Sequence, residues 1–168
     1  MRSVHRGFSW TDLIDYQVFG LDGIYSIPIS ISATYIVLFV ILGTLMEFTG
    51  TGDVIMDIGK AIAGRYRGGP AKVASISSAL FGSISGSAAA NVYATGTFTI
   101  PMMKKIGYSP AFSGAVEAVA STGGQLMPPV MGASAFLMAE LLGVPYIQVC
   151  KAALLPAILY YISLFIVL

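Results

Sequence analysis

The stretch from Val73 to Met103 constrains the fold more than any other part of the chain, because its 31 residues include no charged side chain. Its centre, Gly82 to Asn91 (GSISGSAAAN), consists almost entirely of small and hydroxyl-bearing residues. A single helix of this length would be about 46 Å long, whereas the hydrocarbon core of a bilayer is roughly 30 Å thick. A chain folded back at its Ser85-Gly86-Ser87 centre would instead form two arms of about 20 Å each. We therefore expect a helical hairpin.

Basic residues on both sides of this stretch predict how the hairpin is oriented. They are Arg65, Arg67 and Lys72 before it, and Lys104 and Lys105 after it. Because Lys and Arg are enriched on the cytoplasmic side of membrane segments, both arms should open toward the cytoplasm. Over residues 71–105 we predict a re-entrant helical hairpin whose polar tip lies near the middle of the membrane.

The composition indicates a membrane protein, since 56% of the residues are hydrophobic and only 10% are charged. Soluble domains contain about 25% charged residues. The formal net charge of +1 gives no reason to expect a nucleic-acid partner. The single cysteine, Cys150, excludes an internal disulfide and a multi-cysteine metal site. The first 26 residues hold three Asp and lack the apolar core of a cleavable signal peptide.

Three segments are expected before the hairpin. Residues 1–26 form an extramembrane or interfacial lead-in, and residues 27–48 form a transmembrane helix with its N-terminus outside. Residues 53–67 are predicted to form an amphipathic helix in the membrane interface, because apolar and charged residues occupy opposite faces at helical spacing. The apolar positions are Ile55, Ile58 and Ile62, and the charged ones are Asp53, Asp57 and Lys60.

A second unusual stretch follows the hairpin, over residues 108–142. Its centre reads STGGQLMPP (121–129), and two glycines followed closely by two prolines cannot continue a regular helix. Apolar or small residues lie on both sides, so we predict a discontinuous transmembrane helix with its break inside the membrane. Residues 147–168 should begin another transmembrane helix. Because the sequence stops within that apolar run, we expect it to be a piece of a larger permease.

The two interruptions predict a binding site between them. Helix ends leave carbonyl and amide groups unpaired, and neighbouring side chains add further oxygen atoms. Oxygen ligands without thiolate or imidazole suit hard cations. Discontinuous helices that meet at the midplane are typical of secondary transporters. The oxygen-bearing side chains are those of Ser83, Ser85, Ser87, Asn91, Thr95, Thr122 and Gln125.

Other interpretations of these residues stay open. Gly82 and Gly86 form a GxxxG pattern typical of close helix packing, and membrane serines and threonines often bond to the carbonyl four residues earlier. A channel or a structural membrane subunit is the alternative function, without ion-coupled accumulation. A serine hydrolase is disfavoured, because Ile84 stands where a G-x-S-x-G motif needs serine. Glu117, an acid expected inside the membrane, is either functional or firmly paired.

Four runs of sequence are distinctive in combination: RGGPAKVA (67–74), SISGSAAANV (83–92), TGTFTIPMMKKIGY (95–108) and EAVASTGGQLMPPVMGASAFLMAELLGVPY (117–146). Together they resemble the large membrane subunit of TRAP (tripartite ATP-independent periplasmic) transporters, and most closely the fused permeases of the TAXI type. The resemblance extends over roughly residues 20–168.

This resemblance implies an all-α membrane protein that is not an enzyme, forming the first of two inverted repeats in an elevator-type fold of the ion-transporter superfamily. It implies uptake of organic acids driven by a sodium gradient, or by protons, in a bacterial or archaeal cytoplasmic (inner) membrane that the chain crosses several times. The implied partners are the remaining repeat of the same permease, a periplasmic substrate-binding protein, and a small membrane subunit or its fused equivalent.

The resemblance also assigns residues to the site. Sodium would be held by the hairpin tip and the break, through Ser85, Gly86, Ser87, Asn91, Thr122, Gly123 and Gly124. Substrate would contact Ser83, Thr95, Gln125, Pro128 and Pro129. Proton coupling would draw attention to Glu117 and Glu140.

Overall fold

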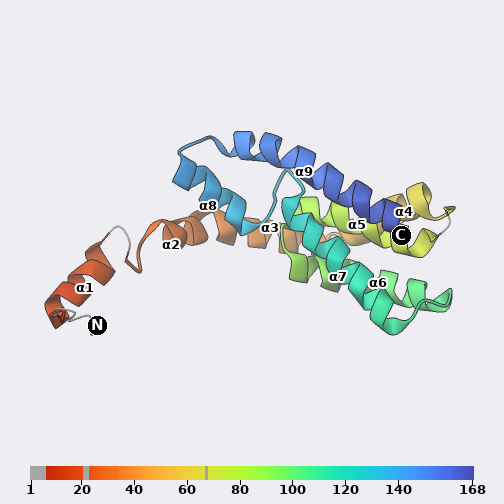
Figure 1. The fold of residues 1–168 in the computed structure, drawn as a ribbon, viewed down its shortest axis with the longest axis horizontal. Coiled ribbons are helices and arrows are strands. Elements are labelled where there is room, and N and C mark those ends of the chain that lie inside the picture. Colours follow the sequence, from red (N-terminus) through yellow and green to blue (C-terminus); the bar gives the residue numbers. More distant parts are fainter. Residues whose placement is uncertain (1–6, 21–22, 67) are drawn as a thin grey trace, which may run out of the picture.

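The fold is all-α in a computed structural model that describes residues 7–20, 23–66 and 68–168, as the composition and periodicity predict (Figure 1). Residues 1–6 of the lead-in and the flanking Arg67 lie outside the described residues. The helices are α1 (Trp10–Phe19), α2 (Ile27–Ile31), η1 (Ser32–Ile36), α3 (Val37–Phe48), α4 (Thr51–Ala63), α5 (Gly69–Ser85), α6 (Ala88–Lys105), α7 (Pro110–Gly123), η2 (Gly124–Leu126), α8 (Ala133–Leu142) and α9 (Tyr146–Val167).

Local sequence signals fix where several of these helices begin. Helix α1 starts at a capping box, in which the Ser9 hydroxyl accepts from the Asp12 N–H and the Asp12 carboxylate accepts from the Ser9 N–H. Ser109 caps α7 by accepting from the Phe112 N–H, and Pro110 supplies the preferred first residue of that helix. Helix α5 begins at Gly69 without a side-chain cap, and Pro70 is its second residue.

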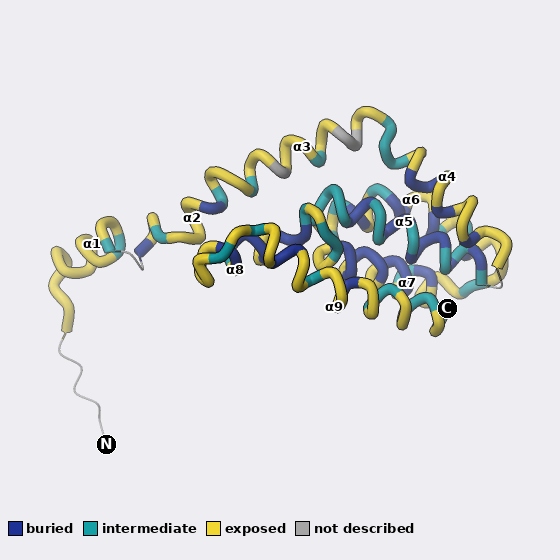
Figure 2. The backbone as a smooth tube through the Cα atoms, turned by 90° about the horizontal axis from the view of Figure 1, so that it is seen from above, coloured by how far each residue is buried: buried dark blue, intermediate teal, exposed yellow. Residues whose placement is uncertain are grey.

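Helices α5, α6 and α7 form the centre of the molecule. They pack against one another, with α4 against α5 and α9 along α5 and α7 (Figure 1). Because α5 and α6 run antiparallel, their basic ends lie together, and Ala71 and Ala74 share a buried cluster with Met103. Helix α3 runs outside this bundle and is exposed along most of its length (Figure 2).

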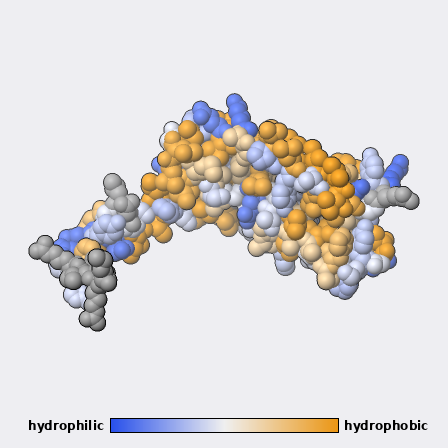
Figure 3. Space-filling view, in the orientation of Figure 1, coloured by the Kyte–Doolittle hydropathy of each residue, from blue (hydrophilic) through white to orange (hydrophobic). Residues whose placement is uncertain are grey.

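The bundle buries many polar groups beside its apolar core, and it exposes many large apolar side chains. The buried polar side chains are Ser75, Ser77, Ser78, Asn91, Thr95, Thr99, Ser113, Glu117 and Ser121. Large apolar side chains cover much of the surface, among them those of α3 and α9, and apolar residues dominate the upper part of the face seen in Figure 3. Among the described residues, two helical stretches, Ile27–Leu45 and Tyr146–Val167, are long and apolar enough to cross a bilayer. An apolar exterior of this extent is that of a protein surrounded by lipid.

Helix α4 packs on α5 through its small residues. Of the three isoleucines on its apolar stripe, Ile55 is buried, whereas Ile58 and Ile62 are 43% and 52% exposed. Gly59 and Ala63 lie against α5 instead, and a Cβ at Gly59 would overlap the Ser77 hydroxyl. Between membrane helices the packing surface favours small residues, because large apolar side chains gain nothing by leaving lipid.

Candidate functional site

The turn between α5 and α6 forms a compact hairpin tip. Helix α5 ends at Ser85, and Gly86 adopts a left-handed conformation (φ +61°) while its N–H donates to the Gly82 carbonyl at 2.9 Å. Ser87 then caps α6, its hydroxyl accepting from the Ala90 N–H at 3.3 Å. Only Gly86 and Ser87 separate the two helices, which accounts for the glycine at this position.

The break in the following helix comes at the predicted STGGQLMPP sequence. Helix α7 ends at Gly123, the single 3₁₀ turn η2 follows, and irregular backbone continues to the start of α8 at Ala133. The Gly132 N–H donates to the Gln125 carbonyl at 2.8 Å, so the irregular segment closes on itself. This backbone lies between helices α7 and α8 in the chain, and its position within a membrane stays a prediction.

The hairpin tip and the break touch through their backbones. The Val130 N–H donates to the Ser83 carbonyl at 3.1 Å. A Cβ added at Gly124 would lie 2.7 Å from the Cα of Gly82, and one at Gly86 would overlap the Met131 carbonyl. Because no side chain fits between them, these glycines allow the two interruptions to meet.

A pocket of about 290 Å³ opens where the tip meets the break. Ile36 and Val40 line it from the side of η1 and α3, and Phe136 lines it from α8. The remaining lining residues are Ser85, Gly86, Ser87, Gln125, Val130, Met131 and Ala133. Four of the residues assigned to the site from the sequence therefore share one pocket: Ser85, Gly86, Ser87 and Gln125.

Ser85 supplies the most informative oxygen of this pocket. Its Oγ is buried and has no hydrogen-bond partner. An unpaired buried hydroxyl costs about 1–3 kcal/mol, so its retention calls for an explanation. Ser87 and Gln125 bring further oxygen atoms to the same space. The pocket is therefore lined by uncharged oxygen-bearing groups beside two helix ends, and groups of this kind can bind a hard cation or a polar substrate group.

Several other predicted residues have side chains engaged elsewhere. The Ser83 hydroxyl donates to the Leu80 carbonyl at 2.7 Å. Thr122 is exposed, and its hydroxyl donates to the Ala118 carbonyl at 2.7 Å. Gly123 is buried against the ring of Tyr160 on α9. These residues can contribute backbone groups near the break, but the hydroxyls of Ser83 and Thr122 bond within their own helices.

The predicted residues Asn91 and Thr95 lie deeper in the bundle. Asn91 is fully buried beneath the contact between Gly82 and Gly124, and its amide donates to the Ser78 carbonyl at 2.8 Å. Asn91 thus links the two arms of the hairpin one turn away from the pocket. Thr95 is also buried, and its hydroxyl lies 2.6 Å from a carboxyl oxygen of Glu117.

The two predicted prolines lie at the outer side of the break. The Pro129 carbonyl accepts from the Tyr146 hydroxyl at 3.1 Å and from the Cys150 thiol at 3.5 Å, and the same Tyr146 hydroxyl contacts the Val130 carbonyl. Pro128 is half-buried. Sequence reasoning did not single out Tyr146, which anchors the break to α9. Its only sequence signal is a tyrosine beside a turn proline in an apolar segment.

Glu117 is enclosed by hydroxyl groups from three helices. Its Oε1 accepts from Thr95, from Ser121 at 3.0 Å and from Ser78 at 3.4 Å, and its Oε2 accepts from Thr99. The carboxyl is 1% exposed. Of the two interpretations left open by the sequence, firm pairing is present, although every partner is uncharged.

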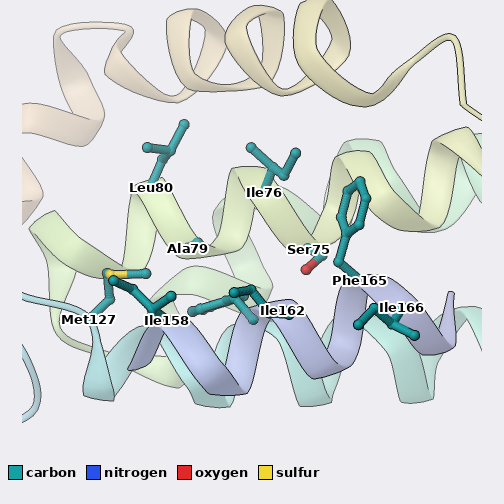
Figure 4. A pocket seen from close by; sticks show the side chains of 10 residues that line it. Ser75, Ile76, Ala79, Leu80, Met127, Ile158, Ile162, Phe165 and Ile166 are labelled. Carbon is teal, nitrogen blue, oxygen red and sulfur yellow. The ribbon is translucent and has the colours of Figure 1, made fainter. Parts of the chain in front are cut away.

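A further cavity of about 340 Å³ lies between α5 and α9, away from the tip (Figure 4). Its lining is apolar apart from Ser75 and Tyr161, with Ile76 and Leu80 on one side and Ile158 and Phe165 on the other. Such a lining offers few ligands to an ion.

Comparison with known proteins identifies the family. The family model described as "Tripartite ATP-independent periplasmic transporter, DctM component" matches residues 3–168. The chain belongs to the DctM family of TRAP transporters. It is 36% identical to the uncharacterized protein y4mL of Sinorhizobium fredii over 72% of this chain. It is also 36% identical to the C4-dicarboxylate TRAP transporter large permease protein DctM of Pseudomonas aeruginosa, over 54% of this chain.

A third relative is the sialic acid TRAP transporter permease protein SiaT of Haemophilus influenzae, 33% identical over 54% of this chain. The chain spans 28%, 21% and 15% of the lengths of these three relatives. No solved structure matches it significantly. Family membership and the apolar helices together identify a membrane protein, as the sequence predicted. The relatives with a named function are permeases. Membership of this chain in the TAXI branch stays a prediction.

Proposed function

We propose that this DctM-family chain forms one half of a secondary active transporter, in which the pocket at the hairpin tip holds the coupling sodium ion and part of the substrate. The observation that carries this proposal is the buried, unpaired Ser85 hydroxyl in a pocket where two interrupted helices meet. A cation bound there would give that hydroxyl a partner. Interrupted helices supply such sites in secondary transporters because their ends carry free polar groups.

The proposed ligands are the side-chain oxygens of Ser85, Ser87 and Gln125, together with backbone carbonyls near Gly86 and Gly124. The α5 and α7 ends contribute carbonyl groups, which carry the negative end of the helix dipole and favour a cation. Asn91 acts in this scheme as a support, since its amide is already bonded to the Ser78 carbonyl. Substrate would bind on the open side of the pocket, toward Gln125 and Phe136.

The hairpin is proposed to be re-entrant, opening at the cytoplasmic face. Its arms have 17 and 18 residues, which corresponds to about 26 Å and about 27 Å, less than a hydrocarbon core of roughly 30 Å. Lys72 lies near the start of one arm, and Lys104 and Lys105 lie at the end of the other. A hairpin with both basic ends in the cytoplasm satisfies the positive-inside rule.

The remaining parts of the proposal follow from the family. The permease would lie in a bacterial or archaeal inner membrane, cross it several times, and contain a second repeat that completes an elevator-type fold. A periplasmic binding protein would deliver the substrate, and a small membrane subunit or fused equivalent would complete the assembly. Organic acids are the proposed substrate class, and relatives are named for C4-dicarboxylates and sialic acid.

Sodium-driven uptake tests the ion site directly. The complete permease carrying this sequence is reconstituted in vesicles with its binding protein, and accumulation is measured against external sodium. Ser85→Ala should raise the sodium concentration needed for half-maximal uptake about tenfold, as expected for the loss of one ligand worth about 1.4 kcal/mol. Ser163→Ala is the matched control, because that helical hydroxyl is exposed and bonds back to the Tyr160 carbonyl.

Two outcomes would contradict the proposal. Equal sodium dependence in both serine variants would show that Ser85 is not a ligand, and uptake without accumulation against a gradient would favour a channel. Topology is tested separately, by single cysteines at positions 72 and 104 in a Cys150→Ala background. Labelling of these two cysteines from opposite sides of the membrane would exclude a re-entrant hairpin.

A further inference from the structure

The cavity between α5 and α9 is separate from the proposed ion site, because it shares no lining residue with the pocket at the hairpin tip. On α9 its lining is partly exposed, with Ile158 and Ile162 at 42% and 49%. It is therefore a groove that opens at the apolar surface of the bundle. We call it the α5–α9 groove, lined chiefly by Ile76, Ala79 and Leu80 of α5 and by Ile158, Ile162 and Phe165 of α9.

The groove extends along both helices (Figure 4). Its lining on α9 covers residues 158–166, which corresponds to about 12 Å. One end lies at Leu80 and Met127, close to the break, and the other lies at Phe165. An elongated apolar groove in a membrane protein suits a lipid hydrocarbon chain, which is as apolar as the side chains that line it.

A half-buried lysine lies at the Phe165 end of the groove. The Lys72 Nζ is 4.8 Å from the ring centroid of Phe165 and 6.0 Å from that of Tyr66. Aromatic faces attract an ammonium group, but they do not neutralise its charge. The one ion pair among the described residues joins Lys60 to Asp57, so no described carboxylate is paired with Lys72. This end of the groove therefore combines an unbalanced cation with an apolar lining.

The residues around Lys72 are of the types that gather at the level of lipid headgroups. The Tyr66 ring packs edge-on against Phe165, with centroids 6.2 Å apart, and the neighbouring Arg65 is exposed. Tyrosine, lysine and arginine are enriched at membrane–water interfaces, and a lysine stem can lie along apolar surface while its ammonium group reaches the headgroups. With Lys72 in the headgroup region, the groove extends from the interface into the hydrocarbon core.

We propose that the α5–α9 groove is a binding site for an anionic phospholipid, with one acyl chain lying along the groove and the phosphate beside Lys72. Basic pockets between membrane helices bind anionic headgroups in this way. An apolar helix from the rest of the permease would also cover the groove, but it would leave Lys72 without an anion. Under the proposed orientation the lipid belongs to the cytoplasmic leaflet, and only this assignment of the leaflet rests on the proposed function.

Photolabelling of the complete permease tests where the lipid lies. The permease is placed in phosphatidylcholine vesicles with phosphatidylglycerol that carries a photoreactive diazirine in its acyl chain, and labelled peptides are identified by mass spectrometry. Residues 158–166 should be labelled, and unlabelled phosphatidylglycerol should compete for this labelling. Ala79→Phe, which places a large side chain in the groove, should lose it. Ala115→Phe is the matched control, because Ala115 is exposed on α7.

Two photolabelling results would overturn the proposal. Wild type without label at residues 158–166 would show that another part of the permease covers the groove. Equal labelling of wild type and Ala79→Phe would show that the lipid chain lies outside it.

The affinity for different headgroups tests the role of Lys72. Native mass spectrometry of the detergent-solubilised permease measures the binding of phosphatidylglycerol and phosphatidylcholine. Lys72→Gln should weaken phosphatidylglycerol binding about fivefold, as expected for the loss of one interfacial lysine, and leave phosphatidylcholine binding unchanged. Lys105→Gln is the matched control, because Lys105 is exposed at the end of α6, which does not line the groove.

Equal phosphatidylglycerol affinity in Lys72→Gln and Lys105→Gln would overturn the proposed headgroup contact. Both binding measurements are made without sodium and without substrate. Failure of the lipid site is therefore distinguishable from failure of the ion site, which depends on the sodium dependence of Ser85→Ala.

Discussion

The contact between Gly82 and Gly124 predicts a strong effect from one added methyl group. In Gly82→Ala the new Cβ would overlap the Cα of Gly124, and it would lie 3.0 Å from both the Gly124 carbonyl carbon and the Asn91 Nδ2. Two of these three atoms belong to the backbone of the break, which cannot rotate away as a flexible side chain can. The hairpin tip and the break must therefore separate.

The size of the effect follows from two opposing terms. Overpacking a close contact costs about 1–3 kcal/mol. Alanine in place of glycine inside a helix returns about 1 kcal/mol through helix propensity. The net result should be a loss of about 1–2 kcal/mol, because the separation also weakens the bond from Val130 to the Ser83 carbonyl.

Gly114→Ala in α7 is the matched control, because a Cβ there meets nothing within 4 Å. It adds the same methyl group to a helix interior and should leave stability unchanged or raise it by up to about 1 kcal/mol. Thermal unfolding of both variants in the purified complete permease, followed by intrinsic fluorescence, measures the difference. If Gly82→Ala melts at or above the temperature of Gly114→Ala, the inferred backbone contact is wrong.

Two other features give separate predictions. Tyr146→Phe removes the hydroxyl that the Pro129 and Val130 carbonyls share as a donor, and should destabilise the permease by about 1–3 kcal/mol. Tyr93→Phe is the control in the same thermal unfolding measurement, because the Tyr93 side chain is 72% exposed. Hydrogen bonds from the Ser9 side chain and backbone lower the pKa of the Asp12 carboxyl. These bonds therefore stabilise α1 fully when the pH is above the usual pKa of Asp, and the stabilisation is lost as the pH falls through the lowered pKa. The amide NMR shifts of the first turn of α1 should change with this titration in wild type, and they should not change in Asp12→Asn.

The sequence predicted the hairpin and the break because each rests on local chemistry. An uncharged run too long for one crossing, with Gly86 at its small-residue centre, needs no knowledge of neighbouring helices. The same holds for Pro128 and Pro129, because two successive prolines just after Gly123 and Gly124 lack N–H donors and clash with the preceding turn. The direct contact between Ser83 and Val130 agrees with the prediction that the two interruptions face each other.

Features that depend on packing could not be predicted in this way. The hydroxyl groups around Glu117 come from three helices, and the direction of each depends on how those helices rotate against one another. Thr122 shows the same limit, since its neighbours Ser121 and Gly123 are buried while its own side chain points outward. On α4, helical spacing identified two faces but not which of them meets α5, because lipid removes the preference for burying isoleucine.

The polar interior of the α5–α7 bundle has a thermodynamic consequence. In a soluble protein, unfolding exposes apolar surface to water and raises the heat capacity by about 12–15 cal/mol/K per residue. Here many large apolar side chains already face outward, and the interior combines hydroxyl, amide and glycine groups with apolar side chains such as Val73, Phe81 and Met103. Calorimetry in lipid should therefore give a smaller heat-capacity change per residue than that of a soluble protein, and the stability of the bundle should vary less steeply with temperature.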